Sequence, residues 1–231
     1  MATTPKPTVS TRMVVGLVAA MAVSDIVGNV LAPEAARVPV KLGILVALLV
    51  WARSSVGLSW DELGLAREHL AAGLRLGGVA AATVAAVIAV LVVDPTTRSA
   101  FESSDIANAS TTRQVLMVLV VIPLGTVLFE ETIFRGVLLG VLLRASTQRT
   151  AVIVSSVLFG FWHVLPALSD ASGKSGATTV GVVVGTVGIT TAAGVLFAWL
   201  RLRSQSLAAP VLAHIATNSL AYIGAVIALH R

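Results

Sequence analysis

Seven long apolar segments constrain this sequence of 231 residues more than any other feature. A helix rises about 1.5 Å per residue, so about 20 mainly apolar residues cross the hydrocarbon of a bilayer. The segments cover residues 13–31, 38–52, 76–93, 115–143, 151–168, 177–200 and 207–229. We therefore expect an all-α membrane protein, a polytopic bundle of about seven transmembrane helices.

The composition is typical of a chain whose solvent is the bilayer. Hydrophobic residues make up 56% of the sequence and charged residues 12%, whereas a soluble domain carries about 25% charge. This excludes a soluble globule, a disordered chain and a coiled coil. The absence of cysteine from the sequence excludes disulfides, thiolate nucleophiles and iron–sulfur clusters. The net charge of +5 is scattered between the apolar segments, which favours anionic lipid headgroups over nucleic acid as its counter-charge.

The polar residues between the apolar segments indicate how the chain is organised. We expect a disordered tail over residues 1–12 and a single transmembrane domain over residues 13–231, with its motif-bearing core at residues 115–222. A cleavable signal peptide is the weaker interpretation, because Asp25 interrupts the first apolar segment. Lys and Arg are more frequent on the side of the N-terminus, which favours an N-terminus inside the cell.

Three local features refine this topology. The Ser59-x-x-Glu62 pattern is a capping box, and we expect it to open an interfacial amphipathic helix with Leu70 on its apolar side. Lys41 lies in the second apolar segment, where we expect its ammonium to snorkel to the membrane surface. Residues 115–143 form a segment longer than the bilayer requires, so it must tilt, break or protrude.

The most informative polar residues are those surrounded by apolar neighbours. Glu130, Glu131 and Arg135 interrupt the fourth segment, whereas His163 lies in the fifth. His214 and Asn218 lie in the last segment. A charge at the centre of a span costs about 2.5 to 3.5 kcal/mol, and a Leu or Val returns only about 0.3 to 0.6 kcal/mol. Such residues are therefore expected to serve a site.

A purely structural interpretation accounts for only part of this set. Glu131 and Arg135 are four residues apart and can form an ion pair on one helical face. Glu130 projects about 100° away from Glu131, so the same arginine does not easily satisfy both carboxylates. His214 and Asn218 share a helical face. A carboxylate, two imidazoles and a carboxamide could enclose a water molecule, with the glutamate as base and the others as hydrogen-bond donors or metal ligands.

The remaining polar residues are assigned no chemistry from the sequence. Asp25 is interpreted as a helix-contact or water-facing residue, and Trp162 as an interfacial anchor. A serine protease is less well supported, because Ser155, Ser156 and Ser219 lie outside any nucleophile-elbow motif.

Three motifs occur in order on separate apolar segments: Glu130-Glu131-x-x-x-Arg135, Phe159-x-x-x-His163 and His214-x-x-x-Asn218. They look like the EExxxR, FxxxH and HxxxN motifs of the CPBP intramembrane proteases, also called the Abi or CAAX protease family, which includes the type II CAAX prenyl endopeptidase. The resemblance covers about residues 115–222.

The resemblance implies a role for each motif residue. By similarity, Glu130 and His163 activate the attacking water, and His214 with Asn218 stabilises the oxyanion of the tetrahedral intermediate. By the same similarity, three further residues support the site: Glu131, Arg135 and Phe159.

The resemblance leaves two mechanisms open. The protein works without a cofactor, with glutamate and histidine acting directly on water, or it is an intramembrane metalloprotease that binds zinc through Glu130, His163 and His214. We favour the metal-free glutamate mechanism.

The expected function is hydrolysis of a peptide bond inside the membrane. The expected partners are the lipid bilayer and a peptide or protein substrate, of a kind that includes lipidated and membrane-associated ones, with no nucleic acid. The expected location is a bacterial cytoplasmic membrane. The alternative is a non-enzymatic transporter or scaffold that uses the same polar cluster as an ion or proton site.

Overall fold

The computed structural model describes residues 9–101 and 104–229, so residues 1–8 of the expected tail lie outside the described residues. Every element in the described part of the chain is helical. The first half contains α1 (Thr11–Asp25), η1 (Ile26–Leu31), η2 (Glu34–Ala36), α2 (Arg37–Trp51), η3 (Ala52–Val56), η4 (Arg67–His69), α3 (Leu70–Val93), α4 (Pro95–Arg98), η5 (Ser99–Phe101) and α5 (Ser104–Ala107). The second half contains α6 (Thr111–Leu116), η6 (Met117–Leu128), α7 (Phe129–Glu131), η7 (Thr132–Leu138), α8 (Leu139–Ala145), α9 (Gln148–Trp162), α10 (Val164–Asp170), α11 (Gly176–Ser204) and α12 (Ala208–Leu229).

Among the described residues, seven helical segments are long and apolar enough to cross a membrane, which confirms the predicted number. They are Thr11–Leu31, Glu34–Val56, Arg67–Val93, Thr111–Ala145, Gln148–Asp170, Gly176–Ser204 and Ala208–Leu229. Large apolar side chains such as Val79, Leu119 and Ile189 are exposed on their outer faces, where a bilayer would cover them. The chain is an integral, multi-pass membrane protein.

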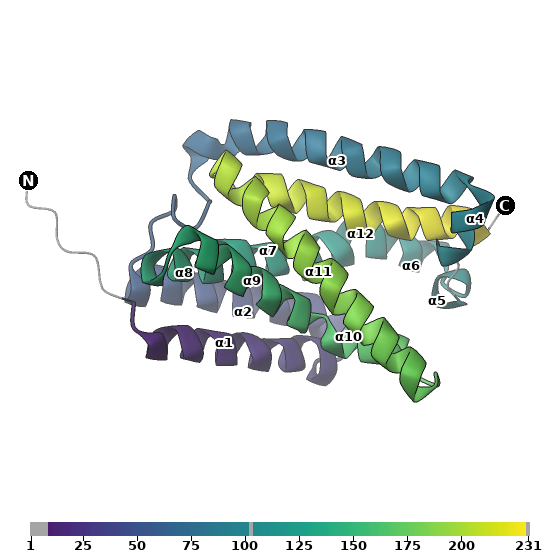
Figure 1. Ribbon diagram of the computed structural model, residues 1–231, viewed down its shortest axis with the longest axis horizontal. Coiled ribbons are helices and arrows are strands. Elements are labelled where there is room, and N and C mark those ends of the chain that lie inside the picture. The colour runs from purple at the N-terminus through teal and green to yellow at the C-terminus, as the bar shows by residue number, and fades with distance from the viewer. Residues whose placement is uncertain (1–8, 102–103, 230–231) are drawn as a thin grey trace, which may run out of the picture.

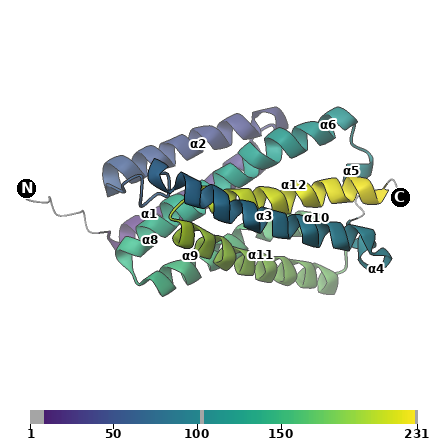
Figure 2. The same cartoon turned by 90° about the horizontal axis from the view of Figure 1, so that it is seen from above.

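The fourth span forms the centre of the bundle. It is 35 residues long, well beyond the roughly 20 that cross a bilayer, and it runs obliquely from α6 at one end of the molecule to α8 at the other (Figure 2). Much of it has wide π-helical turns, and Pro123 lies in one of these stretches, where it lacks an N–H for the helical ladder. Every residue from Phe129 to Leu142 is buried. The span therefore tilts and places its charges at the middle of the protein.

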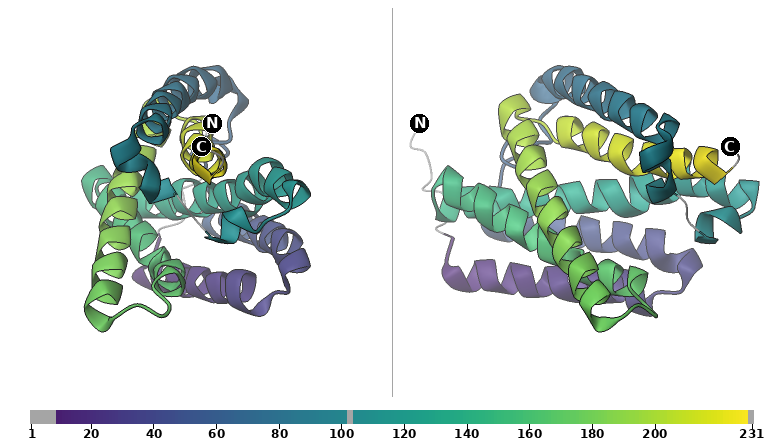
Figure 3. Two further views of the ribbon diagram at one scale, coloured as in Figure 1. Left: turned by 90° about the vertical axis from the view of Figure 1, so that its right-hand side faces the viewer. Right: turned by 45° about the vertical axis from the view of Figure 1, so that its right-hand side comes forward.

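The other spans surround this central helix. The helices α3 and α12 run side by side, and α1 with α2 lies on the opposite side of the bundle (Figure 1). The long helix α11 crosses obliquely and packs along α9 (Figure 3). Small residues allow this approach: a Cβ at Gly160 of α9 would lie 2.0 Å from Thr191 Oγ1 and 2.8 Å from the Val187 carbonyl oxygen of α11. This close contact at Gly160 fixes the C-terminal end of α9, which His163 directly follows.

The loop between the second and third spans differs from the predicted interfacial helix. The capping-box bonds form, because the Ser59 N–H donates to Glu62 Oε2 at 2.7 Å and the Glu62 N–H donates to Ser59 Oγ at 3.1 Å. They close a single turn, which ends at Gly64 in the left-handed region, at φ +75°. Leu70 already belongs to the membrane-spanning α3. The interfacial helix was therefore wrongly predicted.

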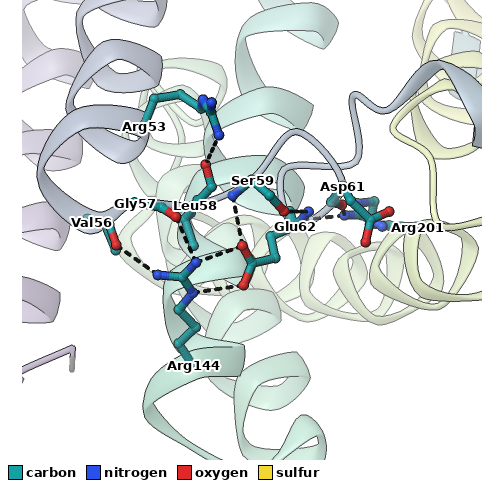
Figure 4. Close-up of polar contacts among 9 residues, drawn as sticks. All are labelled: Arg53, Val56, Gly57, Leu58, Ser59, Asp61, Glu62, Arg144 and Arg201. Atoms are coloured by element: carbon teal, nitrogen blue, oxygen red, sulfur yellow. Dashed lines mark hydrogen bonds and ion pairs between the residues drawn. The ribbon is translucent and has the colours of Figure 1, made fainter. Parts of the chain in front are cut away.

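Three arginines hold this loop against the bundle (Figure 4). Arg144 donates to both carboxylate oxygens of Glu62, at 2.8 and 2.7 Å, and to two loop carbonyls. Arg201 donates to the carbonyl oxygens of Asp61 and Glu62, and Arg53 donates to a further loop carbonyl. These tertiary bonds, which local sequence does not reveal, favour a fixed turn over a helix.

Candidate active site

Two adjacent carboxylates of α7 define the site. Glu130 is 6% exposed and Glu131 is fully buried. Trp162 Nε1 donates to Glu130 Oε1 at 3.1 Å, whereas Glu130 Oε2 lies 3.9 Å from His214 Nε2. Glu130 Oε2 is buried and has no hydrogen-bond partner in the described part of the chain. A buried carboxylate oxygen without a partner is costly, and it is the atom that can accept a proton from a water molecule.

The second carboxylate joins two of the predicted site residues. Arg135 Nη1 donates to Glu131 Oε1 at 3.1 Å, which confirms the predicted ion pair. His214 Nδ1 lies 2.8 Å from the same oxygen. Since an ionised carboxylate only accepts hydrogen bonds, Nδ1 carries the proton. Glu131 therefore fixes the tautomer of His214 as well as pairing with Arg135, a link that the sequence did not reveal.

Aromatic rings enclose these polar groups. The Arg135 guanidinium carbon lies 3.9 Å from the centroid of the Phe159 ring, and the His214 ring stacks on Phe197 at 4.8 Å. Phe159 also meets His214 edge to face, at 6.0 Å between centroids. Such contacts lock side-chain rotamers and keep the surroundings of the charges apolar. Phe159 thus contacts both the Arg135 guanidinium and the His214 imidazole.

The structure brings Asn218 to the far nitrogen of His214. Asn218 Nδ2 lies 3.2 Å from His214 Nε2. The amide nitrogen is a donor, so Nε2 is the acceptor when the imidazole is neutral. Glu130, His214 and Asn218 therefore form one continuous cluster, drawn from α7 and α12.

His163 lies at the edge of this cluster. It is half-buried at the C-terminal end of α9, and its Nδ1 lies 2.8 Å from the Phe159 carbonyl oxygen. Because a carbonyl only accepts, Nδ1 carries the proton and Nε2 keeps its lone pair in the neutral ring. The ring meets Phe159 at 4.8 Å, so Phe159 contacts both histidines. The direct partner that Glu130 has from α9 is instead Trp162, the neighbouring residue.

Two site neighbours were missed from the sequence. Asp25 and Lys41 are each 7% exposed, and both interact electrostatically with Glu130. The snorkelling predicted for Lys41 is wrong, because its Nζ lies inside the bundle, 5.6 Å from the centroid of the Phe129 ring. Trp162 was interpreted as an interfacial anchor, yet its indole N–H binds Glu130. A charge inside an apolar segment was the available signal for Asp25 and Lys41.

An apolar groove runs beside these residues on the lipid-facing side. Its volume is about 250 Å³, and Asp25, Phe134 and Trp162 line it together with apolar residues of α1, α9 and α10. Elsewhere, Ser155 and Ser219 donate to backbone carbonyls of the fourth span. Neither hydroxyl contributes to the Glu130 cluster through these bonds.

The sequence left open a zinc site formed by Glu130, His163 and His214, and the described residues do not assemble it. In the part of the chain that the structure describes, no three His, Asp or Glu side chains converge closely enough to hold one. Both nitrogens of His214 have protein partners, and His163 turns Nδ1 towards a carbonyl. Zinc held through both Nε2 atoms would leave the two Nδ1 bonds in place and displace only the Asn218 amide from His214. Because the three side chains do not converge among the described residues, we derive no step through a metal.

Comparison with known families finds a similarity over the part of the chain that carries the three motifs. Residues 112–220 match the family described as type II CAAX prenyl endopeptidase Rce1-like. This part of the chain is similar to the CPBP, or CAAX protease-like, family. The match begins in α6 and ends in α12 and includes all three motifs, whereas α1 and α2 lie outside it. Neither the curated proteins nor the solved structures contain a match to this chain. This similarity supports a peptidase that acts on a protein or peptide substrate in a lipid environment.

Proposed function

We propose that this protein is an intramembrane endopeptidase in which Glu130 is the general base. The observation that carries the proposal is the buried Oε2 of Glu130, which has no hydrogen-bond partner among the described residues and faces His214 Nε2 at 3.9 Å. A water molecule bound there would give its proton to Oε2 and attack the scissile carbonyl carbon. Trp162 holds the other oxygen, so the carboxylate is oriented before substrate arrives.

His163 assists the same water. With Nδ1 donating to the Phe159 carbonyl, Nε2 presents a lone pair on the half-buried side of the site. It can accept a hydrogen bond from the water, or later pass a proton to the leaving amine. The carbonyl of Phe159 fixes the orientation of the ring.

His214 and Asn218 form the oxyanion site in this proposal. The Asn218 amide has two N–H groups, of which one faces His214 Nε2 and the other is available to a developing oxyanion. The imidazole donates from Nε2 only when it is protonated, and the Glu131 carboxylate at Nδ1 stabilises that cation. Glu131 therefore supports the chemistry through His214, while Arg135 holds Glu131.

The positions of three arginines also support an orientation of the protein in the membrane. Arg53, Arg144 and Arg201 gather at the end of the bundle where α1 begins. By the positive-inside rule we propose that this end, and with it the N-terminus, faces the cytoplasm. We propose that residues 13–231 act as one domain, with substrates that include membrane-associated or lipidated peptides.

The test is the hydrolysis of a peptide substrate by purified protein in vesicles. Glu130→Gln keeps the size of the side chain and can still accept from Trp162, but it removes the base. We expect turnover to be lost while the protein stays folded and peptide binding is largely kept. Glu68→Gln is the matched control, since Glu68 is exposed and lies outside the site. Equal turnover by Glu130→Gln and wild type would remove Glu130 as the base, whereas an absence of turnover in wild type would favour the non-enzymatic ion-site interpretation.

A further inference from the structure

Buried charges of the described chain are concentrated near Glu130. The buried Asp, Glu, Lys and Arg side chains are Asp25, Lys41, Glu130, Glu131, Arg135 and Arg201. Arg201 binds loop carbonyls at the end of the bundle, and Arg135 pairs directly with Glu131. This leaves Glu130, Asp25 and Lys41, of which only Glu130 lies in the segment matched by the family.

The side chain of Lys41 passes between the first two spans and extends to the helix that carries Glu130. Its side chain crosses η1 at Gly28, where an added Cβ would lie 3.0 Å from Lys41 Cγ and 3.2 Å from Cε. Its Nζ then reaches the face of Phe129, at 5.6 Å from the ring centroid. Phe129 immediately precedes Glu130, and Lys41 interacts electrostatically with Glu130 and Asp25. A buried ammonium in an apolar bundle is expensive unless nearby charges compensate it.

Asp25 is the third charged residue of this group. It accepts a hydrogen bond from Asn29 Nδ2 one turn further along the chain, and it interacts electrostatically with Glu130, Lys41 and His163. Asp25 therefore attracts Lys41 but repels Glu130. Two carboxylates therefore interact with the one ammonium.

We propose that Lys41 is a positioning residue for Glu130: the hairpin of α1 and α2 inserts a buried ammonium that keeps the Glu130 carboxylate ionised and ready to accept a proton. Asp25 attracts this ammonium, and its own negative charge partly offsets the effect of the ammonium on Glu130. The inference rests on the proposed role of Glu130 as a base, and it extends the site to two spans that the family match does not cover. Arg135 also interacts electrostatically with Glu130, but it donates its hydrogen bond to Glu131.

The first test separates kcat from KM for peptide hydrolysis in vesicles. Lys41→Met keeps the length of the side chain and removes its charge, so we expect kcat to fall about tenfold to a hundredfold with little change in KM, as part of general-base catalysis is lost. Lys41→Arg should retain most of the activity. Lys174→Met is the matched control, because Lys174 is exposed, and it should behave as wild type. Unchanged kcat in Lys41→Met would overturn the proposal.

A double variant distinguishes an electrostatic role from a structural one. Asp25→Asn removes a negative charge that faces Glu130, so Asp25→Asn/Lys41→Met should have a higher kcat than Lys41→Met alone. If Lys41 only stabilised the fold, the double variant would be no more active per folded molecule. That result would contradict the proposal.

The last measurement needs no substrate. Infrared spectra of the protein in vesicles at neutral pH report protonated carboxyl groups. Lys41→Met should show an absorption of this kind that wild type lacks, and Glu130→Gln in the same background should remove it. Its absence from Lys41→Met would overturn the role of Lys41. If wild type and Lys174→Met cleave no peptide, the proposed function fails separately, and the infrared comparison still decides the inference.

Discussion

Replacement of Arg135 by methionine tests the charge balance at the centre of the bundle. Methionine fills a similar volume, so the change removes the guanidinium with little loss of packing. Arg135 is 1% exposed, bonds to Glu131 at 3.1 Å and lies over the Phe159 ring at 3.9 Å. Breaking a buried pair from one side typically costs about 3 to 5 kcal/mol, because the remaining charge is left uncompensated.

A loss of that size lowers the folding equilibrium at least about a hundredfold, since each 1.4 kcal/mol is a factor of ten. We expect a lower yield of folded Arg135→Met and a lower unfolding temperature in detergent. Arg149→Met is the control, because Arg149 is exposed at the start of α9. Both measurements should leave this control unchanged.

A second substitution, at the ion-pair partner Glu131, makes the test more specific. Two nitrogens of Arg135, Nε and Nη2, are buried without a hydrogen-bond partner in the described chain, so the pair itself is incompletely satisfied. Glu131→Gln/Arg135→Met should therefore be more stable than Arg135→Met alone. It should stay inactive, because His214 then loses its carboxylate partner. An Arg135→Met protein that folds as well as wild type but cleaves nothing would refute this reasoning and assign Arg135 to the chemistry.

Three further outcomes follow from the geometry. Asn218→Ala should slow hydrolysis by about 10² to 10³, less than Glu130→Gln, because one oxyanion donor is lost and His214 remains; an equal loss in both variants would contradict the division of roles. Gly160→Ala should reduce folding yield, since its Cβ would lie 2.0 Å from Thr191 Oγ1, whereas Gly181→Ala, with open space around it, should not; equal yields would show that the approach of α9 to α11 is not tight. A chelator should leave turnover unchanged, and inhibition that added zinc reverses would overturn the metal-free mechanism.

The sequence predicted well those features that follow from hydrophobicity alone. The number of spans depends on segment length and apolar content, and the structure confirms seven. The cost of charges in hydrocarbon directed attention to Glu130, Glu131, Arg135 and His214, and the structure connects all four in one cluster. Neither feature depends on the details of tertiary packing.

Other features depend on neighbours that are distant in the sequence. The direction of Lys41 is set by the open space at Gly28 and by the ring of Phe129, so snorkelling was a reasonable but wrong prediction. The turn after Ser59 is held by the distant residues Arg144 and Arg201 rather than by local propensity. Periodicity does not report such contacts.

The bond between Trp162 and Glu130 is a further example of a tertiary contact. It joins residues 32 positions apart, and only the packing of α9 against the central helix brings them together. A tryptophan beside a motif histidine was a usable signal, but interfacial anchoring explained it equally well.

The central claim is that this membrane bundle hydrolyses peptide bonds with Glu130 as the base. The most direct measurement is mass spectrometry of a defined peptide mixture after incubation with vesicles that contain either wild type or Glu130→Gln. The account predicts new peptide termini with wild type, each pair of fragments heavier by one water than the parent peptide, and none with Glu130→Gln. Identical peptide mixtures in the two samples, cleaved or uncleaved, would contradict it.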